Sequence, residues 1–234
     1  MIKMELQLFG GRGASQTKPS KVGGFKVKKV TLNDGGTIEL GSPLIYGGKD
    51  PALSGDIRSK IEDWEAKRRK NKIEYATILD ENGNVVSESR GGKGSVKTSL
   101  SARMTENSVF SHNHPREEGD VLSGTFSDAD LRNFARFNQT TYRATGKEGT
   151  YSISKSSNFD AEGFTKFVNK TESQHMSTYR SKHKELTSDY VNGKITYSET
   201  VSKQRKLFNE YLVNSHNSLL ENQKTYGYTY TLEK

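Results

Sequence analysis

Two histidines separated by one residue, His112 and His114, lie in the segment Ser-His-Asn-His-Pro at 111–115. Side chains of a β-strand alternate between its two faces, so both imidazoles of a strand here point to the same side. An aspartate from the following segment, Ser-Asp-Ala-Asp at 127–130, can complete a site of three ligands. Two histidines, one carboxylate and a position open to water are typical of a catalytic zinc ion.

Such a site has a defined chemistry. A zinc ion lowers the pKa of a bound water to near 7. A carboxylate within hydrogen-bond reach can then take the proton and deliver it to a departing amine. A hydroxyl group can stabilise the oxyanion that forms. The pattern therefore predicts hydrolysis of a peptide or isopeptide amide.

The order His-Asn-His-Pro and then Ser-x-x-Asp resembles the JAB/MPN (JAMM) metallopeptidases, whose pattern begins with an upstream glutamate. His-Asn-His-Pro is most similar to the RadC-type branch, and the phrase Phe-Ser-Asp-Ala-Asp-Leu to JAB domains of bacterial toxin and phage proteins. The resemblance covers residues 56–154. It implies a Zn²⁺ cofactor bound by His112, His114 and Asp130, with Glu74 as general base and Ser127 as oxyanion helper.

Three alternatives stay open. The interval from His114 to Asp130 is longer than the commonest family spacing, with residues 116–125 as the apparent insertion, so Asp128 is an alternative ligand. Glu88 is an alternative base. Ser127 also fits a helix N-cap with an acid in the first turn, a role compatible with presenting the aspartate.

The expected function is that of a zinc metallopeptidase acting on a protein, peptide or ubiquitin-like conjugate. The N-terminal Met-Glu-Leu-Gln-Leu-Phe-Gly-Gly resembles a segment of phage head-morphogenesis proteins, so phage structural proteins are candidate partners. One alternative is a catalytically inactive JAB-like structural or adaptor protein of a phage particle. The other is a nucleic-acid-associated RadC-like protein.

Composition narrows the class of protein. Hydrophobic residues make up 31% of the 234 residues, which favours a small core with polar extensions. Cysteine is absent, which excludes disulfides and thiolate zinc sites. The net charge of +8 is dispersed, and the basic cluster 67–70 fits a helix end, so nucleic acid is not the expected partner. No apolar run predicts a membrane span or a signal peptide, and we expect a host cytoplasmic or virion-associated protein.

The predicted fold class is α/β, a small JAB/MPN-like mixed sheet with flanking helices and a polar helical C-terminal extension. The helix over 54–70 is expected to anchor Trp64 in the core, and His175, His183 and His216 are expected to be solvated. The predicted parts are a flexible tail (1–24), an N-terminal hairpin (25–53), a metallopeptidase core (54–158) and a helical hairpin whose final strand returns to the core (159–234).

Overall fold

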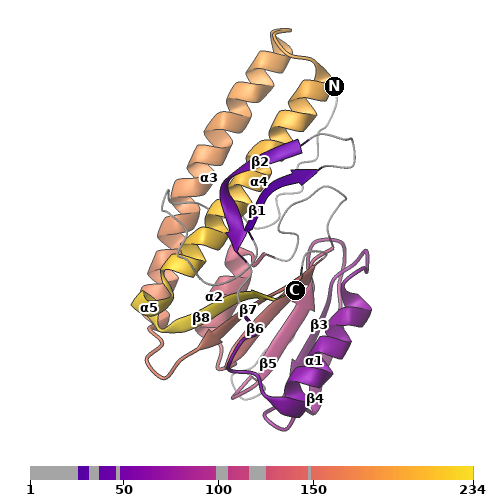
Figure 1. The fold of residues 1–234 in the computed structure, drawn as a ribbon, viewed down its shortest axis with the longest axis vertical. Coiled ribbons are helices and arrows are strands. Elements are labelled where there is room, and N and C mark those ends of the chain that lie inside the picture. Colours follow the sequence, from indigo (N-terminus) through magenta and orange to yellow (C-terminus); the bar gives the residue numbers. More distant parts are fainter. Residues whose placement is uncertain are drawn as a thin grey trace.

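Six strands form one mixed sheet with helices on both faces (Figure 1), which confirms the predicted α/β class. The computed structural model describes residues 26–31, 37–45, 48–98, 105–115, 125–146 and 149–233. The strands lie in the order β4-β3-β5-β6-β7-β8. Their bounds are Tyr75–Leu79 (β3), Val85–Arg90 (β4), Val109–Asn113 (β5), Thr141–Gly146 (β6), Gly149–Lys155 (β7) and Tyr228–Glu233 (β8).

The connections follow from strand direction. β5 and β6 are parallel, and the crossover between them contains helix α2, Asp128–Arg136. The other neighbours are antiparallel, among them the consecutive strands β3 and β4 and the consecutive strands β6 and β7. β8 pairs with β7, so a strand from the end of the described chain completes the sheet.

The two faces of the sheet differ in chemistry. One face is apolar and packs against α2, α3 (Ala161–Val191) and α4 (Tyr197–Glu221). Residues paired across this face include Ile78, Phe110, Tyr142, Ile153 and Tyr230. The opposite face is covered by α1, Gly55–Arg68, and is largely polar where α1 meets the middle of the sheet.

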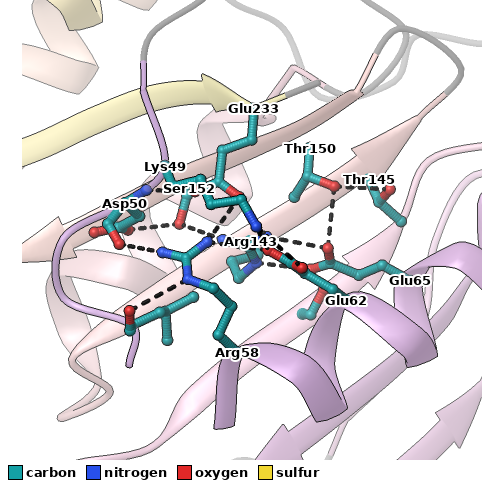
Figure 2. Close-up of polar contacts among 12 residues, drawn as sticks. Lys49, Asp50, Arg58, Glu62, Glu65, Arg143, Thr145, Thr150, Ser152 and Glu233 are labelled. Atoms are coloured by element: carbon teal, nitrogen blue, oxygen red, sulfur yellow. Dashed lines mark hydrogen bonds and ion pairs between the residues drawn. The ribbon is translucent and has the colours of Figure 1, made fainter. Parts of the chain in front are cut away.

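A buried ion network occupies that polar face (Figure 2). Arg143 on β6 places Nε 2.7 Å from Glu65 Oε1 on α1, and its Nη2 lies 2.9 Å from Glu233 Oε2 on β8. The backbone amide of Asp50 donates to the other Glu233 oxygen at 2.5 Å. Ser111 on β5 donates to Glu65 at 2.8 Å. The network therefore joins α1, three strands and the segment before α1.

The position of Trp64 corrects one prediction. Its side chain is only half-buried, and its indole Nε1 donates to Glu88 Oε1 at 2.7 Å. The buried positions of α1 are Ile61 and Glu65. The expectation that Trp64 anchors the core is wrong, because the face of the helix that meets the sheet carries a glutamate for Arg143 instead.

The C-terminal part forms a long antiparallel helical pair, α3 and α4, with a turn at Asn192 and Gly193 between them. A short helix α5, Gln223–Tyr226, leads into β8. The hairpin of β1 (Lys26–Thr31) and β2 (Thr37–Ile45) lies along α4 (Figure 1). The predicted tail 1–24 lies outside the described residues. None of the described helices combines the length and the apolar character needed to cross a membrane.

Two of the C-terminal histidines are buried, so the expectation that they are solvated is wrong. His216 is fully buried, and its Nδ1 lies 2.8 Å from the hydroxyl oxygen of Tyr230. His175 belongs to the apolar stripe of α3, since Phe164, Val168 and Tyr179 are buried at the same helical spacing. Neither of its ring nitrogens has a hydrogen-bond partner among the described residues.

The burial of His175 predicts an acid-sensitive fold. Burial lowers the pKa of His175 to about 3, whereas the unfolded chain protonates near the ordinary value of about 6.5. Stability is therefore lost as the pH falls from 6.5 towards 3. We compare the free energy of unfolding of His175→Leu with that of the wild type. This difference should shift by about 1–2 kcal/mol in favour of the variant between pH 7.5 and pH 5. Urea unfolding at both pH values measures this, and the same gain in His183→Leu, whose half-buried imidazole lies beside Gln204 of α4, would contradict it.

Candidate metal centre

The central strand β5 positions the two histidines. His112 lies on the apolar face between Ala76 of β3 and Ala144 of β6, whose small side chains leave room for the imidazole. His114 follows the strand, and its amide donates to Thr145 at 2.9 Å. The two Nε2 atoms are 2.8 Å apart, so both rings point to the same side, as the spacing predicted.

Helix α2 brings the carboxylate to the histidines. The Ser127 hydroxyl accepts from the Asp130 amide at 3.0 Å, and the Ser127 amide donates to Asp130 Oδ2 at 2.6 Å, which forms a capping box and confirms the N-cap interpretation. The Ser127 hydroxyl also donates to Oδ2 at 2.6 Å. The box holds Oδ1 3.3 Å from His112 Nε2 and Oδ2 3.5 Å from His114 Nε2. The apparent insertion lies almost wholly outside the described residues, yet its two flanks meet at one site.

These three side chains fit a bound metal ion. Ligand atoms 2.0–2.2 Å from a tetrahedral ion lie about 3.3–3.5 Å from one another. The two distances from Asp130 to the histidines match this range, whereas the two Nε2 atoms, 2.8 Å apart, are closer together. His112 Nδ1 is 2.9 Å from the carbonyl oxygen of Arg143. A carbonyl only accepts, so Nδ1 carries the proton and the lone pair of Nε2 points towards His114 and Asp130. Histidines that bind metals commonly donate their other ring N–H to a carbonyl or a carboxylate in this way, which fixes the orientation of the ring.

The charges around the site favour a cation. Burial lowers the pKa of His112, but the carboxylates of Asp130 and Glu74 outweigh it and leave that pKa above its ordinary value. Burial likewise raises the pKa of Asp130, yet His112 and His114 bring it well below its ordinary value. The carboxylate is therefore ionised at neutral pH, as a metal ligand must be.

Glu74 lies in the same place. It is buried and lines a cavity of about 650 Å³ together with His112, His114 and Asp130. Its amide donates to Gly92 and its carbonyl accepts from Gly91, each at 2.8 Å, so the glycine-rich loop fixes its backbone.

The two alternative carboxylates lie elsewhere. Glu88 accepts from the Trp64 indole and does not line the cavity. Asp128 pairs with Arg132 at 2.7 Å on α2 and is not one of the three clustered ligands. The structure thus brings together Glu74, Ser127 and the three ligand residues, and leaves both alternatives out.

Sequence reasoning missed Asn133, Phe137 and Tyr142, which also line the cavity. The signal for Tyr142 was present, because alternation in 140–145 puts it on the same face of its strand as Ala144. Nothing in the sequence identified that strand as the neighbour of β5.

Comparisons with known proteins add no relative. No family model, no curated protein and no solved structure matches the chain. The resemblance to the JAB/MPN metallopeptidases therefore stays a prediction carried by the residues of the motif.

Proposed function

We propose that the protein is a zinc-dependent metallopeptidase that hydrolyses a peptide or isopeptide amide. The observation that carries the proposal is the convergence of His112, His114 and Asp130 with a buried glutamate, Glu74, in one cavity. Two imidazoles and a carboxylate suit zinc among the divalent metals. A cavity open to solvent beside three protein ligands is the arrangement of a catalytic site rather than a structural one.

The proposed mechanism divides the work among the residues of the cavity. When bound, zinc supplies a Lewis acid that makes a water acidic enough to attack an amide at neutral pH. Glu74 accepts the proton of the attacking water and returns it to the leaving amine. His112, held by the Arg143 carbonyl, keeps its Nε2 available as a ligand. Ser127 lines the cavity and keeps Asp130 in place; its hydroxyl, which donates to Asp130 Oδ2 in this structure, would have to turn from that oxygen to donate to the oxyanion.

The proposed substrate is a protein or peptide, such as a ubiquitin-like conjugate, in a phage-related setting. Loop residues 94–98 line one wall of the cavity, next to the loop backbone that fixes Glu74. This substrate class rests on the motif and on the phage-like N-terminal segment.

Glu74→Gln tests the proposed reaction. The amide cannot take a proton, so we expect hydrolysis to fall at least about 100-fold while zinc stays bound. The assay follows release of a dye-labelled lysine peptide from the C-terminal glycine of ubiquitin, and then from a panel of other ubiquitin-like tails. Glu88→Gln is the matched control and should keep wild-type activity.

An inactive adaptor would behave differently. It would hydrolyse no substrate, whether or not it binds a metal ion. Glu74→Gln would then be indistinguishable from the wild type in every assay. Equal activity of Glu74→Gln and wild type on a cleaved substrate would remove Glu74 from the mechanism.

A further inference from the structure

Tyr142 touches two of the three candidate ligands. It lies on β6 directly beside Phe110 of β5, and the two rings stack with centroids 4.4 Å apart. Its ring also meets His112 edge to face at 5.5 Å. Its hydroxyl is 3.4 Å from Asp130 Oδ1. The residue is buried at the base of the cavity, where packing fixes its ring.

The carboxylate of Asp130 needs more than one anchor. The terminal torsion of an aspartate is broad, so a single hydrogen bond does not fix the plane of its oxygens. Ser127 holds Oδ2 through its amide and its hydroxyl, each at 2.6 Å. The Tyr142 hydroxyl approaches the other oxygen, Oδ1, which also faces His112. The two contacts together set the rotation of the carboxylate towards the histidines.

Asn133 lies beside this pair. It is three residues after Asp130 on α2, and therefore on the same side of the helix, and both line the cavity. The contact that orients the carboxylate comes from the Tyr142 hydroxyl, which donates to Asp130 Oδ1.

We infer that Tyr142 is a positioning residue of the metal centre: its ring supports His112 and its hydroxyl orients Asp130. The inference rests on the proposed metal site but not on peptide hydrolysis. Groups that orient metal ligands in this way raise metal affinity by about 10–100-fold. Nothing in the zinc-binding motif itself points to this residue.

Tyr142→Phe is the direct test, since it keeps the ring and removes the hydroxyl alone. We expect zinc affinity, measured by competition with a chromophoric chelator, to fall about 10-fold. The visible absorption of the Co²⁺-loaded protein should also shift, because the aspartate changes its coordination. Tyr228→Phe is the matched control: it removes another buried tyrosine hydroxyl, bonded to the Leu219 carbonyl at 2.7 Å away from the cavity.

The outcomes separate the inference from the proposed function. A zinc affinity and Co²⁺ spectrum of Tyr142→Phe equal to wild type would overturn the inference and leave the metal site standing. An equal loss in Tyr228→Phe would also overturn it, because the effect would then be one of stability. A wild-type protein that binds no zinc would remove the metal site and this inference together.

Discussion

His114→Ala is expected to lose its bound metal, whereas the wild type holds about one zinc ion per chain, as a three-ligand site predicts. The substitution leaves only His112 and Asp130, and two ligands on a cavity wall do not hold a divalent ion against dialysis. It also removes the imidazole whose Nε2 lies 3.5 Å from Asp130 Oδ2. Elemental mass spectrometry of the dialysed proteins gives the metal content directly.

Two matched controls keep this result specific. His183→Ala removes a half-exposed histidine of α3 whose Nε2 contacts Gln204 at 3.2 Å, outside the cavity. Asp128→Ala removes the neighbouring carboxylate that pairs with Arg132. Both should retain zinc. Metal retained by His114→Ala, or lost in Asp128→Ala, would mean that the ligands are not those assigned here.

Arg143→Met is expected to cost about 3–5 kcal/mol of the free energy of unfolding. It leaves the buried Glu65 without its cation and leaves Glu233 only the longer pair with Arg58 at 3.5 Å. Burial lowers the pKa of Arg143, but the carboxylates of Glu65 and Glu233 raise it by more. The pKa therefore lies above its ordinary value, and the guanidinium is charged in the folded protein. Its side chain is fully buried between theirs. Urea unfolding monitored by circular dichroism measures the loss.

The same network offers a rescue and a control. Replacing Glu65 and Glu233 by leucine in the Arg143→Met background removes the unpaired charges and should recover stability. Arg132→Ala breaks a pair whose arginine is 44% exposed, and should cost only about 0–1 kcal/mol. A loss in Arg143→Met as small as in Arg132→Ala would show that the buried network adds little to stability.

The parts of the site that depend on local spacing were predictable from the sequence. The interval between His112 and His114 predicted that both rings share one side, and Ser127 was recognised as a helix cap. The choice between Asp130 and Asp128 was not decided by the sequence, because both lie in the first turn of α2 and the choice depends on which side of that helix faces the strand.

The features that depend on strand order were not predictable. Tyr142 stands beside the histidines only because β6 is the parallel neighbour of β5. Glu65 looks like a solvent-exposed helix residue until Arg143 is found on the strand beneath it. His175 has a polar side chain at an apolar helical position, and only the packing of α3 shows that it is buried.

The pairing of Arg143 with Glu233 has a consequence for synthesis on the ribosome. The two residues are 90 positions apart, so at 5–20 residues per second the nascent chain carries Arg143 for about 5–20 s before Glu233 is made. During that interval β7 has no β8 beside it, and Glu65 is the only carboxylate of the pair available to Arg143. The strand whose Arg143 carbonyl orients His112 is therefore among the last to gain its full ionic support.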